Sequence, residues 1–321
     1  MKEKGRTQAV NYAGIDDFRI LAAVMVIAIH TAPFSGVSQS LDFLLTYCVG
    51  RVAVPFFLMT TGFFVLGSWK KSVYADNSKV IRFIKKTLFL YAVSVVLYLP
   101  VNFYSGELPR SAGGFISMLF FDGTFYHLWY FPAVILGCLA VIVLLRYFSE
   151  RTVLVITVLL YLAGTGGDSY FGLASRIPAL KAVYEAMFTV SSYTRNGIFY
   201  APVFLLMGML IRGRMRQRGE DADGGVGRMT GDIVCLAVSL VLMLGEGYLT
   251  SSMNLQRHNS MYLFLIPVMY FLFRLLLCVP GNAPVWTRNV SMIVYVIHPA
   301  VLIVLRGVAG VAGLTPLLVE N

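Results

Sequence analysis

Several ionisable side chains lie inside long apolar segments of the sequence, where a charged group costs at least ~2.5–3.5 kcal/mol. Arg19 and His30 share the first such segment with ten residues between them, which on a helix places them ~16 Å apart. Arg51 lies in the second segment, and His127 opens the fourth. A neutral imidazole can act as a general base, and a guanidinium group can hold an anion. These four residues are therefore candidates for acid–base chemistry inside a membrane.

Each candidate also has a structural interpretation. His127 could anchor the chain at the membrane interface as part of an aromatic belt, and Arg19 could extend to lipid headgroups. His298 precedes Pro299 and could bond a carbonyl group that the proline leaves free. His30 lies too deep in its segment to reach the interface easily, so we place it first among the catalytic candidates.

A second set of polar residues suits a small zwitterion, which needs a cation for its carboxylate and an anion for its ammonium group. Arg195 with Asp168 or Glu246 can supply such a pair, because the topology predicted below places all three toward the outer side. The structural alternatives are a turn at Gly166-Gly167-Asp168 and a cap or surface ion pair at Arg195.

The composition indicates that a membrane-embedded helical bundle positions these residues. Of the 321 residues, 58% are hydrophobic and 13% are charged, against roughly 25% charged in soluble domains. These values exclude a soluble globular enzyme, a disordered chain and a disulfide scaffold. Nine apolar segments approach or exceed the length that crosses the ~30 Å hydrocarbon core: 18–34, 42–67, 83–103, 126–148, 152–165, 197–212, 232–250, 261–279 and 289–308.

Three segments are expected to be irregular. Pro55 interrupts the second segment and predicts a kink there. The short fifth segment, 152–165, predicts a broken helix. Residues 175–193 mix charged and apolar side chains, which favours an interfacial or re-entrant helix over a span.

Loop charges predict the orientation, because cytoplasmic loops collect Lys and Arg. The net charge is +10, and basic residues concentrate in the leader and in the loops after the second and sixth segments, whereas residues 35–41 and 104–125 carry fewer. We therefore predict a cytoplasmic N-terminus, a flexible cytoplasmic linker at 219–231 and no binding of nucleic acid. Nine spans leave the C-terminus outside, so a cytoplasmic domain after residue 321 would require a tenth span.

The four cysteines lie singly in apolar segments without Cys-x-x-Cys spacing, so we predict neither a disulfide nor a metal site. The sequence contains no internal repeat. We expect residues 1–321 to form a single transmembrane domain.

The order of the motifs resembles the integral-membrane acyltransferase family 3. Arg19-x10-His30 is similar to the Arg/Lys-x10-His signature of that family. The resemblance covers nearly the whole chain and implies an all-α integral membrane protein, a polytopic bundle of about nine to ten transmembrane helices. Its further motifs are Gly50-Arg51-Val52-Ala53-Val54-Pro55-Phe56-Phe57, Thr61-Gly62-Phe63, Arg82-x-x-Lys85-Lys86, His127-Leu128-Trp129 and Ser291-x-x-x-Tyr295-x-Ile297-His298-Pro299.

Three more motifs look like the membrane half of the membrane-bound serine racemases of vancomycin-resistant bacteria: 166–173, 194–199 and 258–264. In that group a multi-pass domain in the bacterial cell membrane precedes a cytoplasmic, PLP-dependent racemase domain, which makes D-serine for altered peptidoglycan precursors. The present sequence stops before the expected tenth span and that domain. We therefore expect PLP only in the absent, covalently linked domain and no racemase activity from this chain alone.

The family resemblance implies acyl transfer from acyl-CoA, with acetyl-CoA the expected donor. Arg82, Lys85 and Lys86 would hold the phosphates at the cytoplasmic side, although such a cluster also fits the bias of cytoplasmic loops. His30 would take the proton of an acceptor hydroxyl, on L-serine or a cell-wall group, at the outer side. Arg19 would hold the cytoplasmic end of the path, and Arg51 or His127 would position the acceptor or the carbonyl group.

The racemase resemblance implies an alternative, the uptake of L-serine for the attached racemase. The residues assigned to this substrate are Asp168, Arg195, Asn196, Glu246, His258 and Tyr262. The absence of an inverted repeat in the sequence counts against transport. A purely structural membrane anchor is the least favoured hypothesis, because one span would suffice for it.

Overall fold

The computed structural model describes residues 12–72, 74–106, 108–218, 226–281, 284 and 286–313. The basic leader, most of the predicted linker 219–231 and residues 314–321 lie outside these ranges. Regular structure in the described part is entirely helical. Its long helices are α1 (Ala13–Thr31), α4 (Ser78–Ser105), α6 (Tyr130–Tyr147), α7 (Glu150–Gly166), α10 (Ala201–Arg218), α11 (Val226–Ser252), α12 (Leu265–Cys278) and α13 (Trp286–Ala312).

The second predicted segment is a composite of short helical stretches. The run passes through a π-helical turn and a 3₁₀ turn before Pro55, which lies in the first turn of α3, where its missing N–H is tolerated. The interruption predicted near Pro55 is therefore observed. The stretches in order are α2 (Gln39–Asp42), η1 (Phe43–Cys48), η2 (Val49–Val52), α3 (Ala53–Phe64) and η3 (Leu66–Ser68).

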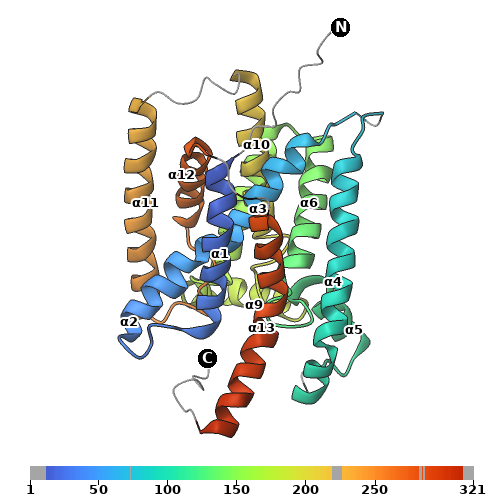
Figure 1. Ribbon diagram of the computed structural model, residues 1–321, viewed down its shortest axis with the longest axis vertical. Helices are drawn as coiled ribbons and strands as arrows, with labels where there is room; N and C mark the ends of the chain where they lie inside the picture. Colours follow the sequence, from blue (N-terminus) through green and yellow to red (C-terminus); the bar gives the residue numbers. More distant parts are fainter. Residues whose placement is uncertain are drawn as a thin grey trace.

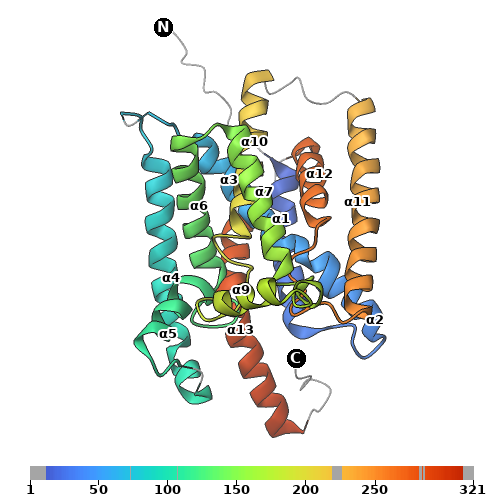
Figure 2. The ribbon, with the colours of Figure 1, turned by 180° about the vertical axis from the view of Figure 1, so that it is seen from behind.

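The remaining short helices lie in connections between the long ones. They are α5 (Ala112–Ser117), η4 (Met118–Asp122), α8 (Phe171–Ala174) and α9 (Pro178–Phe188). Helix α9 falls within the predicted segment 175–193 and crosses one end of the bundle (Figure 2). Its location at a membrane interface stays a prediction.

Each of the nine predicted apolar segments coincides with one of the long helices or with the composite run, and these elements form one bundle (Figure 1). The expected break at 152–165 is wrong, because α7 is continuous from Glu150 to Gly166. Ser149 caps its N-terminus by accepting a hydrogen bond from the Thr152 N–H.

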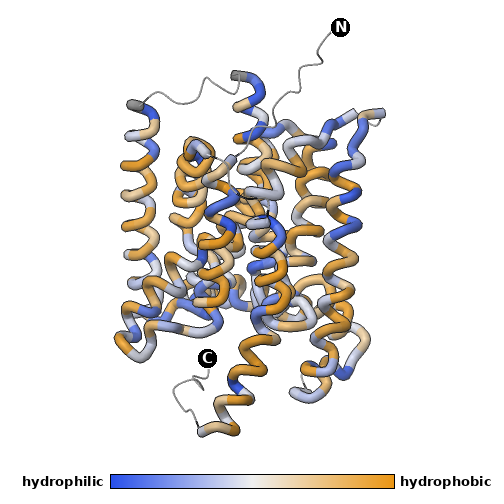
Figure 3. Tube along the Cα trace, in the orientation of Figure 1, coloured by the Kyte–Doolittle hydropathy of each residue, from blue (hydrophilic) through white to orange (hydrophobic). Residues whose placement is uncertain are grey.

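Four helical segments in the described part are long and apolar enough to cross a membrane: Gln39–Ser68, Tyr130–Tyr147, Arg228–Ser252 and Trp286–Ala312. Apolar residues dominate the exposed helices, and hydrophilic ones gather at the end of the bundle where α4 begins and α10 ends (Figure 3). We call this the basic end, since it carries Lys79, Arg82, Arg212 and Arg214. The count of nine to ten spans and the orientation stay predictions.

The centre of the bundle is the contact between α3 and α10. A Cβ atom added at Gly62 would lie 2.0 Å from the Leu205 carbonyl oxygen, and one at Gly208 would lie 2.1 Å from the Met59 carbonyl oxygen. Glycine at both positions thus lets the two backbones touch, as is common between membrane helices. Around this contact, α1, α6 and α12 complete the buried core.

Candidate functional site

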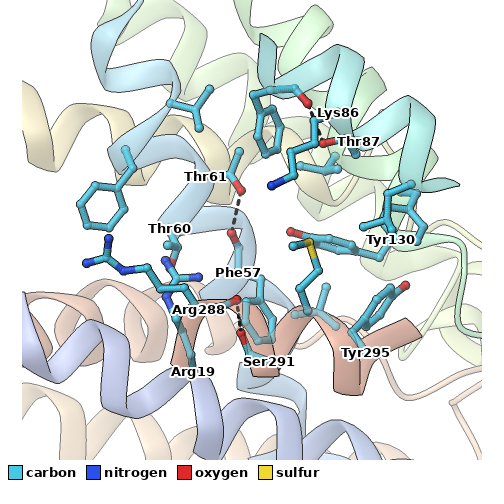
Figure 4. Close-up of a pocket in the computed structure, with 18 of the residues that line it drawn as sticks. Arg19, Phe57, Thr60, Thr61, Lys86, Thr87, Tyr130, Arg288, Ser291 and Tyr295 are labelled. Atoms are coloured by element: carbon cyan, nitrogen blue, oxygen red, sulfur yellow. Dashed lines mark hydrogen bonds between the residues drawn. The ribbon is translucent and has the colours of Figure 1, made fainter. Parts of the chain in front are cut away.

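A cavity of about 470 Å³ opens among α1, α3, α4, α6 and α13. Its polar lining includes four cationic side chains, those of Arg19, Lys79, Lys86 and Arg288. Arg19 and Arg288 lie on one side of the cavity, and Lys86 and the Tyr130 hydroxyl group point in from the opposite side (Figure 4). The lining between them is mainly apolar, so the cavity suits a ligand with an anionic head and an apolar portion.

Asp16 fixes the two arginines of this cavity. Its carboxylate is 2% exposed and accepts hydrogen bonds from Arg19 Nε at 3.1 Å and from Arg288 Nη2 at 2.6 Å. Arg288 Nε also donates to both carboxylate oxygens at 3.0 Å. One carboxylate shared by two guanidinium groups leaves a net positive charge at the cavity wall.

The predicted phosphate-binding cluster divides on α4. All three side chains are exposed, but only Lys86 lines the cavity. Arg51, assigned to the same set, lies in η2 just before α3 and does not line this cavity. Of the basic residues that do line the cavity, Arg288 and Lys79 were missed by the sequence reasoning. The family motifs give no signal for either residue.

Three histidines gather beyond the cavity. The ring of His298 lies 5.5 Å from that of His30 and 5.3 Å from that of His127, measured between centroids. His127 is 2% exposed, and neither of its ring nitrogens makes a well-aligned hydrogen bond among the described residues. The structure thus brings His30 and His127 together, and it adds His298, which had a structural interpretation from sequence.

Tyr295 connects the cavity to the histidines. It lines the cavity, and its hydroxyl group donates a hydrogen bond to the carbonyl oxygen of His127. Its ring centroid is 5.5 Å from that of His127 and 6.4 Å from that of His298. The Tyr295 side chain therefore lies between a ligand that fills the cavity and the histidine cluster.

A second polar cluster forms around the loop 253–264, where two guanidinium groups bind adjacent residues. Arg51 Nη2 donates to the Asn259 side-chain oxygen, and Arg195 Nη1 donates to Ser260 Oγ at 2.9 Å. The Nε atoms of both arginines are buried without a partner in the described part of the chain. Both arginines also interact electrostatically with His30, so this cluster adjoins the histidines.

Asp168 accepts hydrogen bonds from the backbone of the same loop. One of its oxygens accepts the N–H groups of Ser260 at 2.7 Å and Met261 at 2.9 Å. The other oxygen is buried and has no hydrogen-bond partner among the residues described. Burial raises the pKa of this carboxyl group, and the two N–H groups and Arg195 oppose that shift.

Three predicted substrate residues are occupied by structural contacts. Glu246 accepts the Leu263 and Phe264 N–H groups at 2.6 and 3.0 Å, just before α12. The Asn196 side-chain oxygen accepts two N–H groups at the approach to α10. The Tyr262 hydroxyl group is buried and donates to the Tyr47 carbonyl oxygen at 3.2 Å.

His258 stacks on Tyr193, with 4.4 Å between the ring centroids. Burial and the nearby charges of Arg195 and Arg257 lower the pKa of His258 to about 4. His258 is therefore neutral near pH 7. No group of three His, Cys, Asp or Glu side chains in the described ranges is arranged to hold a metal ion.

The apolar spans and the buried polar site define an all-helical membrane protein. The profile of the acyltransferase domain of acyltransferase family 3 matches residues 12–319, so the chain belongs to this family and the resemblance found in its sequence is confirmed. No solved structure matches the chain.

Curated relatives of the chain are named as racemases. It is 36% identical over 289 residues to an amino-acid racemase of Enterococcus faecalis and 37% identical over 292 residues to a serine/alanine racemase of Enterococcus gallinarum. These alignments cover 89% of this chain but 38% and 40% of the two relatives. The chain therefore spans about two fifths of the length of the relatives it matches.

Proposed function

We propose that this chain transfers an acyl group from acyl-CoA, with acetyl-CoA as the donor, to a hydroxyl group of an acceptor at the outer side of the membrane. The observation that carries the proposal is the cavity, which is lined by four cations and by Tyr295, whose hydroxyl group donates a hydrogen bond to the carbonyl oxygen of His127 in the adjoining histidine cluster. Phosphates of the donor would lie near Arg19, Lys86 and Arg288, and its acyl group would reach toward His30.

In the reaction, His30 takes the proton of the acceptor hydroxyl while the oxygen attacks the thioester carbonyl carbon. The carbon–sulfur bond breaks, an ester bond forms, and the proton passes to the leaving thiolate. General base catalysis of this kind contributes about 10²- to 10⁴-fold to the rate. In this proposal the acceptor binds beside Arg51 and Arg195, whose guanidinium groups interact electrostatically with His30.

The test uses the purified chain in lipid nanodiscs with radiolabelled acetyl-CoA and L-serine as the hydroxyl acceptor. We expect acetyl-serine to form and His30→Gln to abolish transfer while acetyl-CoA still binds in calorimetry. Transfer by His30→Gln at the wild-type rate would remove the assigned base. A wild-type chain that does not bind acetyl-CoA would remove the whole proposal.

A second function, uptake of L-serine, is favoured by one specific observation. The buried Arg195 Nε and Asp168 Oδ2 atoms both lack a hydrogen-bond partner among the described residues, and they have the charges that a serine carboxylate and ammonium group require. Serine uptake into proteoliposomes that is reduced by Arg195→Gln and unaffected by His30→Gln would support transport. Undiminished uptake by Arg195→Gln would contradict this binding pair.

We also propose that the chain is the membrane portion of a longer protein whose cytoplasmic domain is a PLP-dependent racemase. The support is that the matched relatives are named racemases and extend well beyond the matched region. In this proposal the cytoplasmic N-terminus and basic end face the racemase, and the product, D-serine, enters peptidoglycan precursors of vancomycin-resistant cells. Serine racemization by the longer protein, and none by residues 1–321, is the expected result.

A further inference from the structure

Two carbonyl groups fix the tautomer of His298. Its Nδ1 atom lies 3.0 Å from the carbonyl oxygens of both Val294 and Tyr295. Carbonyl oxygens only accept hydrogen bonds, so Nδ1 carries the proton and Nε2 carries a lone pair. Pro299 contributes to this arrangement, because it lacks the N–H that would otherwise bond the Tyr295 carbonyl four residues earlier.

The lone pair on His298 Nε2 is left unused by the described residues. The Nε2 atom is buried without a hydrogen-bond partner, in a side chain that is 5% exposed. A buried acceptor without a donor is unfavourable and calls for a functional explanation. The rings that contact His298 are those of His30, His127 and Tyr295.

His30 is the neighbour best placed to donate to this atom. Its imidazole makes ring contacts with Tyr126 and His298 but no hydrogen bond within the described part. Two imidazoles joined by an N–H···N bond have centroids about 5 Å apart, given a bond of about 2.9 Å plus the two ring radii. The observed distance of 5.5 Å is close to that value, but the two rings are stacked at an interplanar angle of 24°, so His30 must turn an N–H edge toward Nε2 to form the bond; His127 lies 5.3 Å from His298 at 73°.

We propose that His298 is a positioning residue: its Nε2 atom accepts a hydrogen bond from one ring N–H of His30, which leaves the other His30 nitrogen with its lone pair toward the acceptor hydroxyl. A rotation of the His30 ring out of its stacked position closes this bond. The proposal rests on the general-base role of His30 in the proposed function. It adds that Pro299 and the two carbonyl groups set the tautomer of that base through His298.

Two substitutions of His298 separate this positioning role from a structural one. In His298→Asn the amide nitrogen takes the place of Nδ1 and can still donate to the two carbonyl groups, but the acceptor at Nε2 is lost. In His298→Gln the longer side chain places its amide oxygen near Nε2, so the acceptor remains while the contact to the carbonyl groups is lost. A purely structural histidine is replaced better by Asn, and a positioning histidine is replaced better by Gln.

The first measurement is nitrogen NMR of the full chain with labelled histidines in nanodiscs. The chain has only four histidines, and His30→Gln assigns the His30 signals. We expect His30 to hold one tautomer in the wild type and in His298→Gln and to become a mixture of tautomers in His298→Asn. An unchanged His30 tautomer in His298→Asn, or a mixture already present in the wild type, overturns the proposal whether or not the chain transfers acyl groups.

The second measurement is the rate of transfer from acetyl-CoA to L-serine. We expect kcat to fall about 100-fold in His298→Asn, within the range for a general base, while the KM for acetyl-CoA stays unchanged. We expect His298→Gln to retain most of kcat. The reverse order, with Asn active and Gln inactive, assigns His298 a structural role only.

Discussion

Lys85 and Lys86 offer a matched test of the proposed donor site. The two residues are adjacent on α4 and both are exposed, but only Lys86 lines the cavity, because neighbouring side chains on a helix point about 100° apart. Figure 4 shows the Lys86 amine inside the cavity, facing Arg19 and Arg288 across it. We expect Lys86→Gln to weaken acetyl-CoA binding and Lys85→Gln to leave it nearly unchanged.

The expected magnitude follows from the positions of the charges. A hydrogen bond to a charged group contributes about 1.5–3 kcal/mol, and the exposure of Lys86 favours the lower end of that range, which corresponds to about a tenfold rise in Kd. Arg19 and Arg288 remain at the cavity wall, so binding weakens without being lost. Lys85 acts only through solvent, where charges are screened over about 8 Å at physiological salt, so its removal should change Kd by less than about twofold.

Isothermal titration calorimetry of acetyl-CoA with the purified chain measures both variants. At low ionic strength the effect of Lys86→Gln should grow, since screening is weaker. Equal losses in the two variants would mean that the phosphates sense only the general charge of the basic end. No loss in Lys86→Gln would refute the assignment of this cavity to the donor.

Three further predictions concern the structure around the site. Gly208→Ala should destabilise the chain by about 1–3 kcal/mol in a denaturant titration, because the added Cβ atom would lie 2.1 Å from the Met59 carbonyl oxygen. Gly213→Ala is the control and should not destabilise the chain, because a Cβ atom added there meets no other atom within 4 Å. Glu246→Gln should lower Tm without changing serine binding, because it weakens charge-assisted hydrogen bonds at the start of α12 that are worth about 1.5–3 kcal/mol. Burial lowers the pKa of His258 to about 4, so the folded state binds fewer protons at this group than the unfolded state, whose pKa is about 6.5. The contribution of His258 to stability is therefore complete above about pH 6.5 and is lost as the pH falls toward 4. His258→Gln should flatten the dependence of Tm on pH in that window, and an unchanged slope would contradict this.

The helices were predictable from sequence because the length and apolarity of a membrane segment are local properties. Each predicted segment has a helix, and Pro55 lies in the first turn of α3, where its missing N–H is tolerated. The continuity of α7 was not predictable from its short apolar stretch, because Glu150 and the Ser149 cap extend the helix with polar residues that a hydropathy criterion omits.

The site was only partly predictable, because its geometry depends on contacts between distant segments. The contact between Asp16 and Arg288 joins residues 272 positions apart, and no local pattern indicates it. The rotational position of α4 against its neighbours separates Lys86 from Lys85, and motif matching treats the two residues alike. The sequence assigned Glu246 to the substrate, but its N–H partners just before α12 come from the tertiary fold.

Helices α1 and α13 together explain the spacing of the family motif. The two helices pack against each other and run in the same direction, from the basic end toward the opposite end (Figures 1 and 2). Near the basic end, Asp16 joins Arg19 of α1 to Arg288 of α13, and we call this the anion-binding level. Further along the two helices the rings of His30 and His298 are in contact, and we call this the histidine level.

The two levels are separated by similar distances on both helices. Arg19 and His30 are 11 positions apart and Arg288 and His298 are 10 apart, which corresponds to about 16 and 15 Å of helix. Between them on α13, Ser291 and Tyr295 follow at intervals of three and four, so they share the face that lines the cavity. Parallel packing of two helices with matched spacings therefore aligns an anion-binding level with a histidine level, and the ten residues between Arg19 and His30 set the distance that a bound donor would have to bridge.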